Sequence, residues 1–186
     1  LKHTHGTKVV TTALPFACTF YGTTYASGAL VTVGRKGAMG FNDQSANGDN
    51  ANNVNLPSSL GTTMKPAIFP FWDDMNYTGT DANSSVCRAT TGSAPFRKFV
   101  VTWKVMKILG DTNGQDNLTF SAILSEGSDR IDFAYNTMTS AAKQAQANGN
   151  SATIGVQNPA GTVATVVFNT ANSAGTNKGY SVVPNP

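Results

Sequence analysis

The stretch KFVVTWKVM (98–106) decides the fold that this sequence predicts. Its apolar residues run or alternate as they do in a half-buried β-strand, and LTFSAILSE (118–126) and RIDFAYN (130–136) follow the same pattern. The residues EGSDR (126–130), between the last two runs, fit a hairpin turn. Three consecutive strands of this kind indicate an antiparallel sheet.

Further strand-like runs, separated by clusters of Gly, Asn, Pro and Asp, occupy most of the remaining chain. They cover residues 7–12, 16–22, 29–34, 37–42, 67–72, 151–158, 162–169 and 179–184. We expect hairpins around Arg35 and Lys36 and at NPAG (158–161), and a polar loop at 42–55. The run AIFPFW (67–72) contains a proline, which removes a ladder donor and indicates an edge strand or a bulge.

The only helix candidate is TMTSAAKQAQANG (137–149), which Thr139 or Ser140 could cap and Gly149 could end. It lacks a broad apolar stripe, so we expect one or two exposed turns. The predicted fold is therefore all-β, an antiparallel β-sandwich of about ten short strands with at most one short helix. Residues 13–186 form a single domain, and residues 1–12 form an extended N-terminal arm or the first strand.

Composition excludes several classes of protein. The chain has 186 residues, of which 12% are charged and 40% hydrophobic, and this balance indicates one compact, turn-rich domain with a neutral polar surface. The net charge is +3, but the basic residues are scattered, so we expect no nucleic-acid partner. No run approaches the roughly 18 apolar residues of a membrane span. The chain begins at Leu1, so we expect a processed or trimmed product.

The two cysteines, Cys18 and Cys87, lie in or beside strand-like segments. No residues near them have the spacing of metal ligands, which leaves two buried free thiols or a disulfide. Because the composition is typical of a secreted protein, we expect a disulfide between Cys18 and Cys87.

Asp73 and Asp74 are the only adjacent carboxylates in the chain. Neighbouring strand residues point to opposite faces, so the two carboxylates would diverge instead of converging on a substrate. We expect a structural corner, in which one aspartate accepts backbone N–H bonds and the other faces water. The alternative is a Ca²⁺ site, whose further oxygens would come from Asp43, Asp49 and Asp81.

No catalytic residues are predicted. His3 and His5 are the only histidines, and they lie at the terminus without a Cys or a further His to complete a metal site, so we interpret them as incidental surface residues. A Ser-His-Asp triad would need its base from that terminus. Glu126 is the only glutamate and lies in the expected turn, which argues against a carboxylate protease.

Aromatic residues could form either the core or a sugar-stacking platform. We favour the core, because aromatic side chains dominate the interiors of sandwiches. The residues are Phe16, Phe20, Tyr21, Tyr25, Trp72, Phe99 and Trp103.

Five motifs in order resemble the nidogen-like domains of secreted and cell-surface proteins, especially bacterial ones. They lie in LPFACTFYGTTYASGALVTVGRKGAMGFN (14–42), FPFWDD (69–74), TGSAPFRKFVVTWKVM (91–106), TFSAILSEGSDRIDFAYNTM (119–138) and SATIGVQNPAGT (151–162). The likeness covers about residues 13–169. One departure is VGRKGAMGF, where the pattern has a sequence like SSNGYLSF, so this turn differs from the family's.

The resemblance implies a non-catalytic extracellular or cell-surface module, and it transfers no catalytic residue. Its partners would be other proteins or cell-surface glycans, and it could assemble with itself as a subunit of a pilus-like appendage or filament. The alternative is a carbohydrate- or Ca²⁺-dependent binding domain of a larger secreted protein. We expect no cofactor, apart from Ca²⁺ in that alternative. The β-capable arm at 1–12 could be the domain's own strand, a strand donated to a neighbour, or the remnant of a removed helix.

Overall fold

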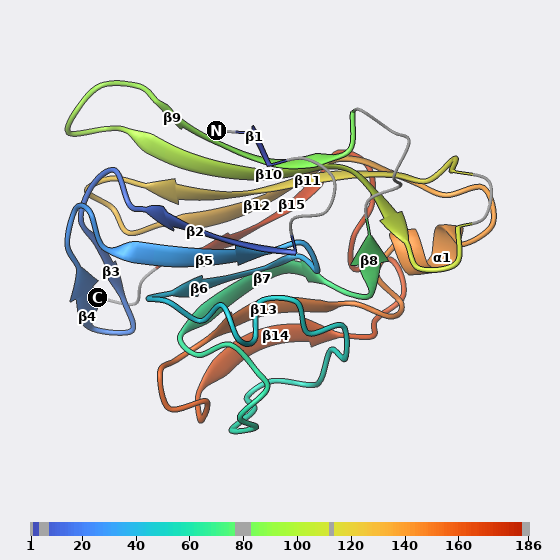
Figure 1. Cartoon of the computed structure of the whole chain (residues 1–186), viewed down its shortest axis with the longest axis horizontal. Helices are drawn as coiled ribbons and strands as arrows, with labels where there is room; N and C mark the ends of the chain where they lie inside the picture. Colours follow the sequence, from blue (N-terminus) through green and yellow to red (C-terminus); the bar gives the residue numbers. More distant parts are fainter. Residues whose placement is uncertain (1, 4–7, 77–82, 112–113, 184–186) are drawn as a thin grey trace.

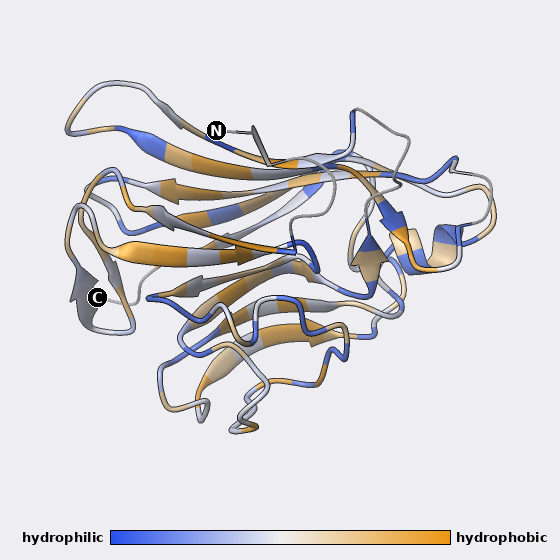
Figure 2. Ribbon diagram, viewed as in Figure 1, coloured by the Kyte–Doolittle hydropathy of each residue, from blue (hydrophilic) through white to orange (hydrophobic). Residues whose placement is uncertain are grey.

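The computed structural model describes residues 2–3, 8–76, 83–111 and 114–183. Within them the chain forms fifteen strands and one short helix, and nearly all of the strand pairing is antiparallel. Two large sheets lie face to face with the apolar side chains between them, so the predicted β-sandwich is confirmed (Figures 1 and 2). The strands are more numerous than the ten or eleven expected, because short additional pairs extend the sheets.

The first sheet has the strand order β1-β9-β10-β11-β12-β15, with β8 paired to the far end of β10. Its strands are β1 (Lys2–His3), β8 (Met75–Asn76), β9 (Ser85–Thr91), β10 (Lys98–Ile108), β11 (Asn117–Ser125), β12 (Ile131–Thr139) and β15 (Lys178–Val182). Strands β10, β11 and β12 are its longest and correspond to the three runs from which the fold was predicted. Strand β9 was not predicted, since its exposed half shows no clear alternation.

The second sheet has the order β14-β13-β7-β6-β5-β2. Its strands are β2 (Val9–Ala13), β5 (Leu30–Gly34), β6 (Ala38–Phe41), β7 (Ala67–Trp72), β13 (Thr153–Gln157) and β14 (Ala164–Phe168). A separate hairpin of β3 (Cys18–Phe20) and β4 (Thr23–Tyr25) lies at one end of the sandwich (Figure 1).

Two hydrogen bonds cross the core from one sheet to the other. The indole Nε1 of Trp103 on β10 donates to the carbonyl oxygen of Gly34 on β5 at 2.8 Å. The hydroxyl of Tyr135 on β12 donates to the carbonyl oxygen of Pro70 on β7 at 2.7 Å. Both aromatic side chains are almost fully buried, so their polar ends need partners inside the protein. The two bonds thereby fix how the sheets lie on each other.

Pro70 lies in a β-bulge of the central strand β7, so of the two predicted alternatives, an edge strand or a bulge, the second is correct. The register between β7 and β13 shifts by one residue there, so that Pro70 and Phe71 together oppose a single residue. Beyond the bulge, Phe71 faces the core between the sheets, while Trp72 faces the outer side and stacks on Phe69 with ring centroids 5.0 Å apart. Without the bulge, strict alternation would have put Phe71 on the outer side with Phe69.

The loop between β6 and β7, residues 42–66, covers this outer side of the second sheet. Beneath it lies a smaller apolar cluster, which we call the outer cluster: Ala38, Leu56, Met64, Ala67, Phe69 and Trp72, with Val54, Ala164 and Val166 packed against it. Side-chain amides and the indole of Trp72 satisfy the loop's backbone. Gln157 accepts from Ser58 N–H at 3.0 Å and donates to the Met64 carbonyl at 2.9 Å, and Trp72 Nε1 donates to the Asn50 carbonyl. The polar loop is therefore an ordered cover.

The remaining local predictions can be compared directly with the structure. The hairpin at Arg35 and Lys36 joins β5 to β6, and the turn at 126–130 joins β11 to β12. The predicted helix is a single turn, α1 (Gln144–Ala147), because β12 continues to Thr139. No helix in the described part of the chain is long or apolar enough to cross a membrane. The segment expected as an arm supplies β1 and β2 to the domain's own sheets.

We predict that Gln157→Met destabilises the protein by about 2–4 kcal/mol, because two buried backbone groups of the covering loop lose their partners. The side chain of Gln157 is fully buried, so water cannot replace the amide. Urea unfolding followed by tryptophan fluorescence measures the change. The matched control is Gln115→Met at an exposed position, where we expect a change within about 0.5 kcal/mol. Equal effects of the two substitutions would show that the amide does not hold the loop.

Candidate binding cleft

Asp73 and Asp74 lie at the corner that follows β7. Asp73 is 7% exposed, and its carboxylate accepts from Ser151 Oγ at 2.6 Å and from the Asp74 backbone N–H at 2.7 Å. Burial raises the pKa of Asp73, and these hydrogen bonds oppose the shift. Asp74 is partly exposed and forms an ion pair with Lys36, whose side chain is buried. The two carboxylates thus have separate partners, and the chain itself supplies each of them.

Asp49 and Asp43, also considered as metal ligands, have partners of their own within the chain. Asp49 accepts from Arg35 at 2.6 and 3.0 Å, and Asp43 accepts the backbone N–H of Ser45 at 3.0 Å. Asp81 and His5 lie outside the described residues, and of His3 only the backbone is described. Among the residues that the structure describes, no three His, Cys, Asp or Glu side chains are grouped as metal ligands.

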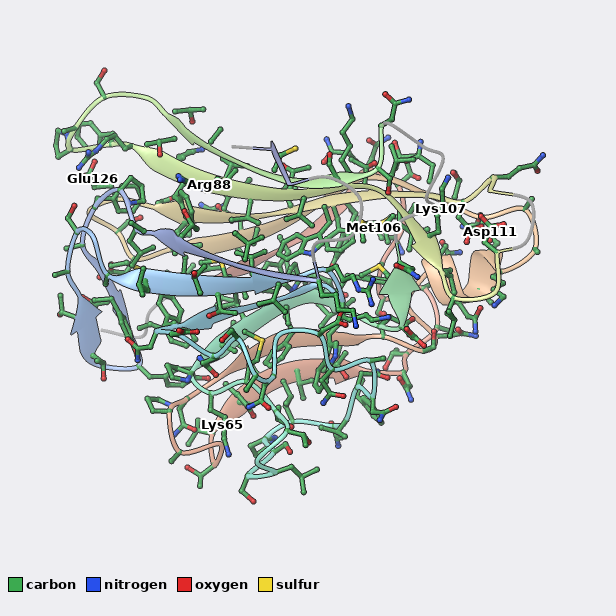
Figure 3. All side chains as sticks on the ribbon, viewed as in Figure 1. Lys65, Arg88, Met106, Lys107, Asp111 and Glu126 are labelled. Carbon is green, nitrogen blue, oxygen red and sulfur yellow. The ribbon has the colours of Figure 1, made fainter. Side chains whose placement is uncertain are left out.

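Glu126 lies in the turn between β11 and β12, at the end of the sandwich opposite Lys107 and Asp111 (Figure 3). Its carboxylate accepts from Arg97 Nε, Nη2 and the backbone N–H at 2.6–3.0 Å, and these hydrogen bonds lower its pKa. The guanidinium of Arg97 also lies over the ring of Phe16 at 5.4 Å. Glu126 therefore joins the β9–β10 hairpin to the β11–β12 turn.

The disulfide expected between Cys18 and Cys87 is wrong, because both cysteines are free. Cys18 is buried and lies on β3 opposite Tyr25, whereas Cys87 lies on β9 between the backbones of Lys2 and Thr102. The two strands belong to different sheets, and no S–S bond joins the two cysteines. Burial, with a smaller contribution from the carboxylate of Asp129, raises the pKa of Cys18 to about 12. Its thiol is therefore protonated near neutral pH.

Six of the seven aromatic residues assigned to the core from the sequence are buried. Phe16, Phe20, Phe99 and Trp103 belong to the main core, and Trp72 belongs to the outer cluster. Tyr25 is buried as well, and Tyr21 is 39% exposed. A sugar-stacking platform built on the predicted set would thus be left with Tyr21 as its exposed ring.

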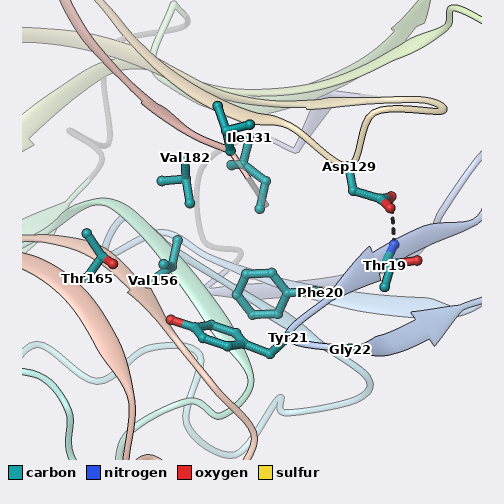
Figure 4. A pocket seen from close by; sticks show the side chains of 10 residues that line it. Thr19, Phe20, Tyr21, Gly22, Asp129, Ile131, Val156, Thr165 and Val182 are labelled. Atoms are coloured by element: carbon teal, nitrogen blue, oxygen red, sulfur yellow. Dashed lines mark hydrogen bonds between the residues drawn. The ribbon is translucent and has the colours of Figure 1, made fainter. Parts of the chain in front are cut away.

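Tyr21 lies at the rim of an apolar cleft of about 460 Å³ that the sequence did not indicate. The cleft opens where the β3–β4 hairpin meets the edges of the two large sheets (Figures 1 and 4). Its lining comes from five places in the sequence: Thr19, Phe20, Tyr21 and Gly22; Asp129 and Ile131; Val156; Thr165; Val182 and Val183. Such distant segments meet only in the folded chain, so no local motif could have revealed the site.

Three residues with positive φ shape the cleft. Tyr21 has φ 47° and Gly22 has φ 73°, so the β3–β4 hairpin uses a turn that requires two left-handed residues. A bulky residue is rare there, which marks Tyr21 as a strained position. Asp129 has φ 51°, and its carboxylate accepts the N–H of Thr19 at 2.8 Å (Figure 4). This bond fixes the hairpin against the β11–β12 turn and so holds the cleft's wall.

The cleft is lined mainly by apolar side chains. The walls are aliphatic or aromatic, and the polar groups at the edge are hydroxyls and the carboxylate of Asp129, which already holds a backbone N–H. A second, polar hollow of about 450 Å³ lies in the covering loop. There the amides of Gln44 and Asn47 bind backbone carbonyls of the loop and its flanks. The apolar cleft is therefore the stronger candidate for a ligand's apolar side chain.

Comparison with known proteins gives one match. A family model described as NIDO related matches residues 2–184, which is nearly the whole chain. No curated protein and no solved structure matches the chain significantly.

We predict that Asp73→Asn gains stability relative to the wild type as pH rises from about 4 to 7. The pKa of Asp73 is raised in the folded protein, so its carboxyl group stabilises the fold most at pH values below its ordinary pKa. This stabilisation is lost as pH rises through the raised pKa. Asparagine stays uncharged throughout. Urea unfolding at several pH values gives the difference. If Asp73→Asn instead loses stability relative to the wild type over this range, the burial argument is wrong.

Asp74→Asn is the matched control at the same corner. It leaves the buried ammonium of Lys36 without its carboxylate, so we expect a loss of about 1–3 kcal/mol at neutral pH.

We predict that iodoacetamide modifies Cys87 but not Cys18 in the native protein without reductant. Cys18 is 2% exposed and has a pKa of about 12, whereas Cys87 is half-buried. After unfolding in urea, again without reductant, both thiols should react. Intact-mass spectrometry counts the modified thiols. A chain in which no thiol is modified after unfolding would support the disulfide between Cys18 and Cys87 after all.

Proposed function

Because the chain belongs to the family of NIDO-related domains, we propose that it is a non-catalytic extracellular module that works by contact with other proteins at a cell surface. The family match over residues 2–184 is the observation that carries this proposal. Within it we favour a structural or adhesive role, including a subunit of a surface appendage. The predicted secreted, bacterial origin agrees with this role.

The described carboxylates support a role without turnover. Asp73, Asp74, Asp49 and Glu126 each bind a hydroxyl, a cation or a backbone N–H of the chain itself. General acid–base chemistry needs two such groups free to face one substrate, whereas each of these four already has a partner within the chain. They stabilise loops and turns instead. We propose that the domain uses no cofactor.

The alternative is a carbohydrate- or Ca²⁺-dependent binding domain. It would require exposed rings or free carboxylates, and the exposed ring of Tyr21 at the cleft is the feature that favours a sugar. The apolar walls beside it favour a side chain of a protein partner more strongly.

We predict that beads carrying the purified chain attach to cells by a protein contact that does not depend on metal. The beads are offered to bacterial and animal cells with and without EDTA, and to cells first treated with protease. Attachment should survive EDTA and fall after the protease treatment. Beads carrying the chain unfolded and alkylated are the control.

A glycan array probed with the same chain distinguishes the carbohydrate- or Ca²⁺-dependent alternative from our proposal. Binding to a glycan that EDTA abolishes, together with a melting temperature raised by millimolar Ca²⁺, would replace our proposal. Attachment to no cell surface would contradict both.

A further inference from the structure

Strand β14 (Ala164–Phe168) is an open edge of the second sheet. Within the described residues it pairs only with β13, and it lies at the margin of the sandwich (Figure 1). Its side chains are half-buried, apart from the exposed Thr165, and Val163 just before the strand is 54% exposed. An edge of this kind presents backbone groups to which another strand can pair.

The backbone bonds at both ends of β14 show which groups face outward. Val163 accepts from the N–H of Asn158, and the N–H of Asn169 donates to Ala152, so both residues point toward the neighbouring chain of the hairpin. Successive residues of an antiparallel strand alternate in direction. Ala164, Val166 and Phe168 therefore direct their N–H and C=O groups away from β13. The Phe168 carbonyl agrees with this, because it accepts from the hydroxyl of Thr170 at 3.0 Å.

The edge also lacks the charges that protect edges in other proteins. No charged residue occurs between Lys143 and Lys178, a span that contains β13 and β14. Apart from β14, the strands that end the order of the two large sheets carry or adjoin a lysine: Lys2 in β1, Lys8 before β2 and Lys178 in β15. Lysine on an edge strand opposes pairing with another copy, since two like charges would be brought together. Of these edges, β14 alone is free of that repulsion.

We propose that β14 is a self-association edge, which pairs antiparallel with β14 of a second copy around Val166. This inference rests on the proposed contact function and names the surface and the partner. A two-fold axis at Val166 places each outward-facing residue opposite another outward-facing residue, so the free N–H and C=O groups exchange hydrogen bonds. The second sheets of the two copies then form one continuous sheet.

The side chains of this register are complementary. Phe168 lies opposite Ala164 of the second copy, on the face where Ala164 and Val166 pack against the outer cluster. Thr165 lies opposite Val167 of the second copy, on the face toward the cleft and the main core. A large ring beside a small side chain fills a cross-strand position well. The cleft beside Thr165 then receives the apolar Val167 of the partner.

A five-residue strand buries less surface than the roughly 1,200 Å² of a stable interface, so the association should be weak in dilute solution. On a bead or a cell many copies lie close together, and weak contacts of this kind then act jointly.

Sedimentation equilibrium of the purified chain, from micromolar to millimolar concentration, tests the proposal. The wild type should show a reversible monomer–dimer equilibrium, and Thr165→Lys should weaken it by at least about tenfold, because it puts a lysine on the edge. Thr11→Lys is the matched control, since Thr11 is an exposed threonine on β2, the opposite edge strand of the same sheet. It should leave the equilibrium unchanged. Thermal melts establish that both variants are folded.

A second variant covers the case in which Thr165→Lys does not fold. Val166→Pro removes an outward N–H and spares the bonds to β13, so it should also give a monomer. A wild type that stays monomeric at millimolar concentration overturns the proposal, and so does a dimer that Thr165→Lys or Val166→Pro leaves intact, or one that Thr11→Lys disrupts. Bead attachment to cells is a separate measurement, so the contact function can stand where self-pairing fails.

Discussion

The hydrogen bond from Tyr135 to the carbonyl of Pro70 is the interaction on which the rest of the structure depends. A proline in a central strand cannot donate to the ladder, and the bulge around it turns the direction of the following residues. Tyr135, which lies on the facing sheet, donates its hydroxyl hydrogen bond to the carbonyl at this bulge. The same bulge puts Phe71 into the core and Trp72 outside it, so one irregular position determines the packing on both faces of β7.

The positions of the Asp73–Asp74 corner and of the covering loop depend on this change of side-chain direction at the bulge. Because Trp72 points outward, its indole reaches the Asn50 carbonyl and holds the 42–66 loop over the outer cluster. The next residue, Asp73, then turns inward, where Ser151 and a backbone N–H satisfy its carboxylate. The course of the chain thus places the carboxyl group of Asp73 in the interior. Burial raises its pKa, and these hydrogen bonds partly offset the cost of desolvation. The adjacent carboxylates, conspicuous in the sequence, thus have a structural explanation.

Features with a short-range signal could be predicted, and those that depend on distant segments could not. Alternation along 98–106, 118–126 and 130–136 was enough for β10 to β12, and the proline at 70 narrowed its strand to an edge strand or a bulge. The sequence could not show on which face Trp72 would lie, because the direction of a bulge depends on its partner strand. The disulfide was wrong since composition indicates a compartment but says nothing of whether Cys18 and Cys87 meet. The cleft escaped notice because its lining comes from five separate segments.

The distribution of charge connects the fold to the proposed role. Several of the 23 charged residues form ion pairs that hold turns, such as Arg97 with Glu126 and Arg35 with Asp49, and the β13–β14 hairpin has no charged residue. Paired charges add little to a binding surface, whereas a neutral edge keeps its backbone groups open to another strand. The uncharged hairpin and the apolar cleft share Val156 and Thr165, so the side chain that an added strand places opposite Thr165 lies at the cleft. Edge and cleft therefore form one surface, in which the backbone supplies affinity and the cleft selects the side chain.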